Sequence, residues 1–188
     1  MSYLKKLEYE IVLNESFLVV RGCSGCGRKT RFQNTKKFRV NANGNRLDIW
    51  LIYQCELCKH TFNLAIYERL RVSSVPKEEY MRYLENDERL ADMFGKSLQL
   101  FRKNKVDVDY ERVIYSFVKR HETVEDCGDS RKHIAIKIHN SYALRIRPEK
   151  QIAEVLGLSK SRVRKMIQQG EVVLEYVSQL LVLGYVYC

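Results

Sequence analysis

Two Cys-x-x-Cys motifs constrain the fold of this chain more than any other feature of its sequence. They are Cys23-Ser-Gly-Cys26 and Cys55-Glu-Leu-Cys58. Two thiolates separated by two residues can bind one ion from a tight turn, and a second such turn completes a tetrahedral set of ligands. An Asn43-Gly44 pair lies between the motifs, flanked by strand-like runs, and this dipeptide is typical of a tight hairpin. We therefore expect a β-hairpin to bring the two cysteine turns together.

The glycines of the first motif suit such a turn, because Gly25 and Gly27 let the backbone amides fold toward the sulfurs without a Cβ in the way. The arrangement resembles a zinc ribbon. It predicts one structural zinc ion per chain, held by Cys23, Cys26, Cys55 and Cys58. Four thiolates leave no coordination position open for water or substrate, so we expect this zinc to stabilise the fold without taking part in catalysis.

Other interpretations of these cysteines stay open, namely two unrelated reduced pairs or a redox-active pair. A thioredoxin-like site is disfavoured, because neither pair opens a helix in a β-α-β context. His60 lies close to the second motif and is expected to be a neighbour of the site and not a ligand. Cys127 and Cys188 have no partner at ligand spacing and are expected to be incidental.

The chain is strongly basic, which favours an anionic partner. It has 188 residues, a formal net charge of +10 and a pI of about 9.3. The usual partner of such a chain is nucleic acid, and a less usual one is an anionic membrane. The N-terminus carries acidic residues unlike a signal peptide, and no apolar run reaches the roughly 20 residues that span a bilayer. We therefore expect a cytoplasmic location, reduced cysteines and no membrane partner.

Local sequence patterns predict an α+β fold in three regions. Residues 1–72 are rich in strand-forming residues and form the predicted zinc-ribbon domain. Residues 73–126 are predicted to be helical, and their last helix, DYERVIYSFVKRH, is expected to be capped by Asp109. Residues 127–188 begin with a polar link and continue with a strand-like run, two helices and an apolar strand-like tail.

The two helices of the last region lie in the stretch RPEKQIAEVLGLSKSRVRKMIQQGEV, from Arg147 to Val172. Pro148 suits a first helical turn, Gly157 ends the first helix, and Ser159 or Ser161 can cap the second. Cations lie at the entrance of the first helix and on the polar side of the second, where they can contact phosphate groups. They are Arg145, Arg147, Lys160, Arg162, Arg164 and Lys165.

Two kinds of nucleic-acid-binding motif resemble this stretch. Ala153, Gly157 and Val163 occupy the small, turn and apolar positions of a DNA-binding helix-turn-helix. The segments RPEKQI, LGL, SKSRV and MIQQGEV resemble the alpha-L RNA-binding motif of ribosomal protein S-four and the pseudouridine synthases. That resemblance implies two helices followed directly by a strand, which present cations to structured RNA. The chain departs from the motif at Pro148, where the family has leucine, and lacks the family's Val-Asn-Gly after the strand.

A third resemblance concerns most of the chain. Its most distinctive run, KFRVNANGNRLDIWLIYQCELC, is similar to an uncharacterised family of small bacterial cytoplasmic proteins, which implies an architecture but no activity. No nucleophile with its base, no carboxylate pair and no phosphate-binding glycine loop occurs at convincing spacing, so no enzymatic activity is expected. We expect a protein that binds structured RNA. The alternatives are a DNA-binding regulator and a protein-interaction adaptor that docks through residues 73–126.

Basic and aromatic residues also alternate around the cysteines, as they do in proteins that bind single strands through phosphate contacts and base stacking. The aromatic residues are equally explained as the core of the ribbon, and we favour that explanation. Trp50, in the apolar run IWLIY, is accordingly expected to be buried. The basic residues of this region are Arg28, Lys29, Arg31, Lys36, Lys37, Arg39 and Arg46.

Overall fold

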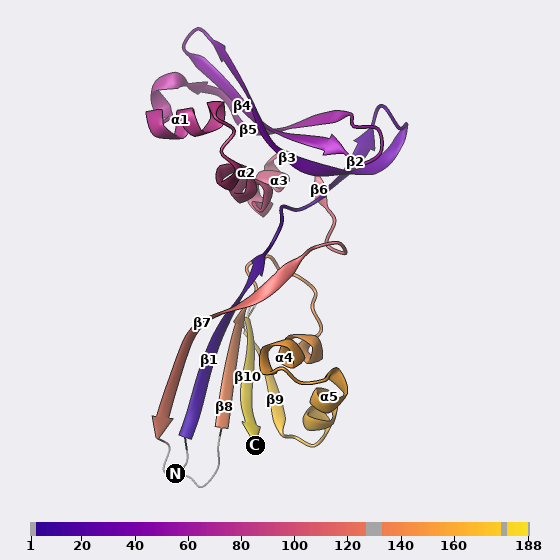
Figure 1. Cartoon of the computed structure of the whole chain (residues 1–188), viewed down its shortest axis with the longest axis vertical. Coiled ribbons are helices and arrows are strands. Elements are labelled where there is room, and N and C mark those ends of the chain that lie inside the picture. The colour runs from indigo at the N-terminus through magenta and orange to yellow at the C-terminus, as the bar shows by residue number, and fades with distance from the viewer. Residues whose placement is uncertain (1–2, 127–132, 178–179, 188) are drawn as a thin grey trace. The chain divides into compact units, whose positions relative to one another are not determined.

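The computed structural model describes residues 3–126, 133–177 and 180–187 and divides the chain into two compact units (Figure 1). The inserted unit comprises Leu13–Ile114, and the terminal unit comprises Met1–Val12 and Tyr115–Cys188. The fold is mixed α+β. The units divide the chain differently from the predicted ranges 1–72, 73–126 and 127–188, because the N-terminal strand pairs with strands of the C-terminal part.

The inserted unit contains a sheet with the strand order β5-β4-β3-β2-β6, in which the paired neighbours run antiparallel. The predicted hairpin joins β3 to β4, but its loop lies one residue later than expected. Asn43 pairs with Arg46, so Gly44 and Asn45 form the loop, and Gly44 has a φ of +59°. The strands are β2 (Val19–Cys23), β3 (Arg28–Asn43), β4 (Arg46–Cys55), β5 (Thr61–Arg71) and β6 (Asp107–Val108).

Strand β4 is buried on one side only. From Leu47 to Cys55 every second residue is buried, and the residues between them are partly exposed. This alternation is the pattern of a sheet that packs on one face and meets solvent on the other. Trp50 lies on the solvent side and is only half-buried, so the expectation that it belongs to the core is wrong.

Three helices pack on the buried face of this sheet. They are α1 (Lys77–Leu84), α2 (Glu88–Gly95) and α3 (Leu98–Lys103), and a short 3-10 turn at Val72–Ser74 precedes them. Phe38 of β3 contacts Tyr83 of α1 and Phe94 of α2, with ring centroids 5.0 and 6.4 Å away. Tyr53 of β4 contacts Phe101 of α3 at 6.3 Å. These edge-to-face contacts form the core between helices and sheet.

The last helix predicted for the middle region does not form. Residues 115–126 are strand β7 (Tyr115–Asp126), which lies beside β1 in the sheet and contains aromatic and β-branched residues that favour a strand, such as Tyr115, Phe117 and Val118. Asp109 caps no helix. It is buried, forms an ion pair with the Arg31 guanidinium, and accepts a 3.0 Å hydrogen bond from the backbone amide of Glu111. This ion pair joins the segment that follows β6 to strand β3.

The terminal unit contains a second sheet, with the order β7-β1-β8-β10-β9. Strand β1 runs parallel to β8, and β10 runs antiparallel to both β8 and β9. Ion pairs cross the strands on its surface, including Lys5 with Glu122 at 2.6 Å and Lys137 with Glu8 at 2.7 Å. The remaining strands are β1 (Tyr3–Leu13), β8 (His133–His139), β9 (Val172–Val177) and β10 (Leu180–Tyr187).

Two helices, α4 (Pro148–Leu156) and α5 (Lys160–Gln168), lie between β8 and β9 in the sequence, as predicted. Their buried residues include Ile152 and Ala153 of α4 and Val163 and Met166 of α5. Within the described residues, no helix has both the length and the apolar character needed to cross a membrane.

The ion pair of Asp109 gives a test of the inserted unit. Asp109→Asn keeps the size of the side chain but removes its charge, so we expect the free energy of unfolding to fall by about 1–3 kcal/mol at neutral pH. Urea unfolding measures this change. Asp107→Asn alters an exposed carboxylate two residues away and should stay within about 0.5 kcal/mol of wild type. Equal effects of the two substitutions would contradict a stabilising role for the ion pair.

The same carboxylate sets the direction of a pH dependence. Burial acts to raise the pKa of Asp109, but the Arg31 guanidinium and the amide of Glu111 outweigh burial and hold that pKa below its ordinary value. The side chain of an unfolded aspartate has a pKa of about 3.9. The stabilisation is therefore present above that pH and is lost as the pH falls through the lower pKa of the folded state.

Candidate metal centre and candidate nucleic-acid interface

The two cysteine motifs form two turns with the same backbone geometry. Cys23 and Cys26 lie in the turn between β2 and β3, and the amide of Gly27 donates a 2.9 Å hydrogen bond to the Cys23 carbonyl. In the turn after β4 the amide of Lys59 donates a 3.2 Å hydrogen bond to the Cys55 carbonyl. The residue that ends each turn is left-handed, with φ of +67° at Gly27 and +65° at Lys59. Each turn thus directs its two sulfurs to the same side.

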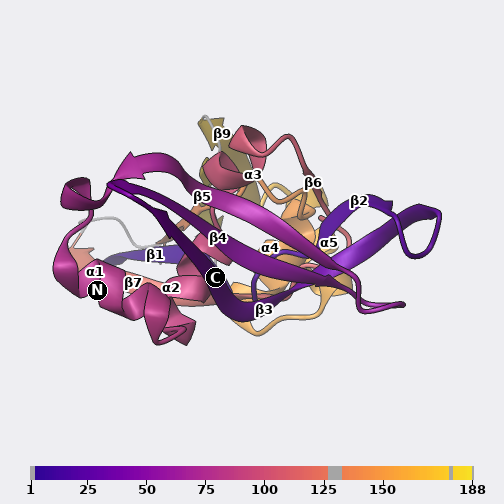
Figure 2. The same ribbon diagram turned by 90° about the horizontal axis from the view of Figure 1, so that it is seen from above.

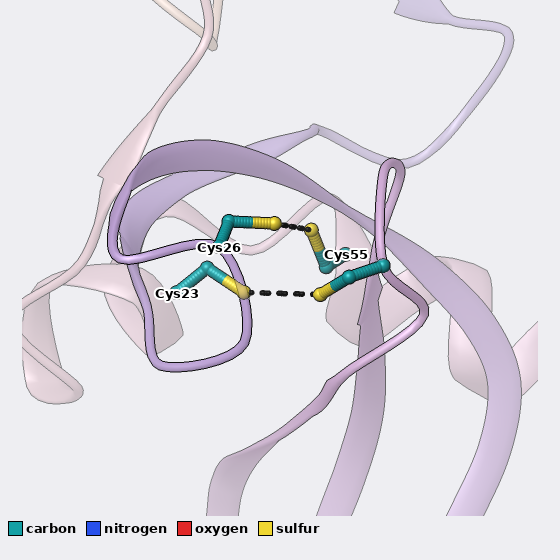
Figure 3. Close-up of side chains that lie close together, drawn as sticks. Cys23, Cys26 and Cys55 are labelled. Atoms are coloured by element: carbon teal, nitrogen blue, oxygen red, sulfur yellow. Dashed lines mark hydrogen bonds between the residues drawn. The ribbon is translucent and has the colours of Figure 1, made fainter.

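The four sulfurs meet in one cluster (Figure 3). The Sγ atoms of Cys26 and Cys55 are 3.9 Å apart, and those of Cys23 and Cys58 are 3.4 Å apart. All four ligand atoms lie within 4.8 Å of one another. A tetrahedral zinc–thiolate site has Zn–S distances of about 2.3 Å, which places its sulfurs about 3.8 Å apart. The cluster therefore has the size and the donor set that can hold a metal ion.

The two glycines of the first turn contribute in different ways. A Cβ on Gly25 would lie 2.8 Å from the Cys58 sulfur, closer than real Cβ atoms approach, so Gly25 permits the two turns to meet. A Cβ on Gly27 would meet nothing within 4 Å, but its positive φ favours glycine. Lys59, at the corresponding place in the second turn, adopts that conformation with a side chain.

Neighbouring groups act unequally on the four thiols. Burial acts to raise the pKa of Cys55, but hydrogen bonds from the Thr30 hydroxyl and from the amides of Cys58 and Leu57 lower it to about 6. The Cys58 sulfur, with burial and Cys23, raises the pKa of Cys26 to about 12. Four negative charges cannot share this volume without a cation, so the full set of thiolates requires a metal ion.

Other residues near the cluster support it. His60 is no member of the four-ligand set, and its Nε2 lies 2.9 Å from the Ser24 hydroxyl. The buried Thr30 hydroxyl lies 3.3 Å from the Cys55 sulfur, a contact that no local sequence signal indicates. Cys127 and Cys188, which are expected to be incidental, lie outside the described residues.

The helical pair has the caps that its sequence predicts. Gly157 ends α4 with a φ of +66°, and the amide of Leu158 donates to the Ala153 carbonyl at 2.9 Å. Ser159 caps α5 by accepting a hydrogen bond from the amide of Arg162 at 3.2 Å. Strand β9 then begins at Val172, only two residues after Gly170.

All six predicted phosphate-contacting cations are exposed in this structure. One of them, Arg164 of α5, forms an ion pair with Glu149 of α4 at 3.7 Å. The part of the chain that the structure describes provides no carboxylate partner for the other five: Arg145, Arg147, Lys160, Arg162 and Lys165. The arrangement can therefore present positive charge to solvent from α5 and from the residues that precede α4.

Comparison with known proteins identifies a family but no activity. A family model described as "Protein of unknown function (DUF1062)" matches residues 40–177, which include the second cysteine motif and both helices of the pair. No curated protein matches the chain. No solved structure matches it either.

Gly25 gives a test of the approach between the two turns. Gly25→Ala places a methyl group against the Cys58 sulfur, so we expect a lower melting temperature and a metal content well below that of wild type. Gly22→Ala is the matched control, because its methyl group meets nothing within 4 Å. Thermal unfolding and elemental analysis of both variants measure the difference. A Gly25→Ala protein that behaves like Gly22→Ala would contradict close contact between the turns.

Proposed function

The chain belongs to the DUF1062 family, and for this member of it we propose a non-catalytic function, the binding of structured RNA through α4 and α5. The observation that carries the proposal is the exposure of Arg145, Arg147, Lys160, Arg162, Arg164 and Lys165 on and beside one capped helical pair. Phosphate contacts of this kind supply most of the affinity of nucleic-acid-binding proteins.

Several features support these residues as phosphate ligands. Val163 and Met166 anchor α5 by burial, so the cations that flank them in the sequence are held on a fixed element. The first turn of α5 also carries the positive end of the helix dipole, which favours an anion there. The net charge of +10 adds long-range attraction to any polyanion.

The preference for RNA over duplex DNA rests on the segment between α5 and β9. The chain passes through Gly170, with φ of +72°, and Glu171 directly into β9, the order that the alpha-L motif has and a DNA-reading helix does not require. A DNA-binding helix-turn-helix is the runner-up, because α4 and α5 have the length and the short connection of such a motif. The two alternatives predict different preferred ligands, which are structured RNA for the alpha-L-like motif and duplex DNA for the helix-turn-helix.

The proposed cofactor is one zinc ion, held by Cys23, Cys26, Cys55 and Cys58. Sulfur donors at these separations suit zinc, and the close approach of the second turn to Gly25 fits a closed four-ligand site. When bound, the ion would neutralise the thiolates and link the β2–β3 turn to the β4–β5 turn. Such a site is structural, because no ligand position is left for a reactant.

Removal of one ligand tests the zinc proposal. Wild-type protein is expected to contain one zinc per chain by elemental analysis, and Cys55→Ser should lose it and unfold at a lower temperature, because three ligands hold the ion less tightly. Cys127→Ser removes a cysteine outside the two motifs and should retain the metal. Iron in place of zinc, or zinc that persists in Cys55→Ser, would refute the assignment.

Charge reversal tests the helical pair. Arg162→Glu combined with Arg164→Glu should weaken binding to structured RNA by at least about 100-fold at low salt, because two phosphate contacts become repulsive. Fluorescence anisotropy with labelled RNA, at two salt concentrations, measures this loss. The same assay with duplex DNA separates the RNA proposal from the DNA alternative.

The matched control for this test is Lys77→Glu combined with Arg89→Glu. It makes the same change in net charge at exposed positions of α1 and α2 in the inserted unit. The control should lose little affinity beyond the general electrostatic effect. Equal losses in the two double variants would locate the binding site elsewhere than on α4 and α5.

A further inference from the structure

The solvent face of the sheet in the inserted unit carries the lone tryptophan of the chain. In the register of the strands, Trp50 of β4 lies between Arg39 of β3 and Ala65 of β5. The next row on the same face is Lys37, Ile52 and Asn63, since side chains of alternate residues point to the same side. Figure 2 shows the three strands β3, β4 and β5 side by side.

The helices of the inserted unit pack against the other face. Their aromatic side chains contact the buried Phe38 and Tyr53 and the partly exposed Tyr67 on that face. On the tryptophan face, by contrast, Lys37 and Arg39 are exposed and Trp50 and Ile52 are half-buried. An aromatic ring and an aliphatic side chain thus lie at the surface beside two cations.

The charge of this face is mostly positive. The paired positions around Trp50 carry Lys37, Arg39, Arg46 and Arg71, against the acid Asp48, and the exposed Glu68 lies in the β5 irregularity opposite Asp48. The backbone amide of Arg69 donates a 2.7 Å hydrogen bond to the Asp48 carboxylate at Oδ1. Within the described residues, Lys37, Arg39 and Arg71 form no ion pair with a carboxylate. The face therefore offers free cations to an anionic partner.

From this juxtaposition we propose that the β3-β4-β5 face binds single-stranded nucleic acid, with an unpaired base stacked on Trp50 and its phosphates on Lys37 and Arg39. A tryptophan at the surface of a sheet, flanked by cations, provides the two interactions that single strands need. Base pairing hides the faces of the bases inside a duplex, so the stacking contact selects unpaired nucleotides.

This surface is separate from the helical pair. Trp50 and its neighbours lie in the inserted unit, whereas α4 and α5 lie in the terminal unit. The proposal does not depend on RNA binding by α4 and α5.

Intrinsic fluorescence reports on this face alone, because Trp50 is the one tryptophan in the sequence. Titration of the full chain with a single-stranded oligouridylate should quench Trp50 emission to saturation, and a fully paired RNA hairpin should quench it much less. Trp50→Leu should weaken binding of labelled oligouridylate by roughly 5- to 150-fold, the loss of one stacked base.

The phosphate contacts are tested by a matched pair of double variants. Lys37→Ala combined with Arg39→Ala should reduce the affinity for oligouridylate. The control, Lys77→Ala combined with Arg89→Ala, should leave that affinity near wild type.

The helical-pair variant separates this proposal from the proposed function. Arg162→Glu with Arg164→Glu should leave quenching by oligouridylate largely intact, even where binding of structured RNA is lost. Anisotropy that shows oligouridylate bound without any quenching of Trp50 would overturn the proposal. A change in Trp50 emission with protein concentration alone would also overturn it, because a second copy of the chain would then occupy the face.

Discussion

One-sided burial of strand β4 is the constraint on which the inserted unit depends. Leu47, Ile49, Leu51 and Tyr53 are fully buried against the helices, and the same alternation carries Cys55 into the sulfur cluster at the end of the strand. It also leaves Trp50 on the opposite face. A shift of the register by one residue would exchange the two faces, so the metal centre and the exposed tryptophan depend on the same packing.

The sulfur cluster connects two turns of the inserted unit, which the contact between the Ser24 hydroxyl and His60 Nε2 at 2.9 Å also joins. Cys23 and Cys26 come from the β2–β3 turn, and Cys55 and Cys58 come from the β4–β5 turn. An ion at this position would oppose separation of the two turns. The terminal unit has no comparable cluster among its described residues, and its sheet relies on ion pairs and on buried apolar side chains such as Ile136 and Ile138.

Features with short-range causes could be predicted from the sequence. The two turns follow from cysteine spacing and glycine, and the ends of α4 and α5 follow from Gly157 and Ser159. The helix predicted for residues 109–121 is wrong, because the apolar residues of this segment fit either a helical or a strand period until a neighbouring strand is known. That neighbour is β1, more than a hundred residues earlier in the chain, and local propensity contains no information about it.

The sequence by itself determined the four sulfur donors, their division into two turns, and the basic helical pair, because each depends on residues only a few positions apart. The tertiary structure decided that the turns meet, that Asp109 joins Arg31, and that Trp50 faces solvent. Each of these depends on strand register and on contacts between distant segments. Side-chain chemistry can be read locally, whereas burial is a property of the packed sheet.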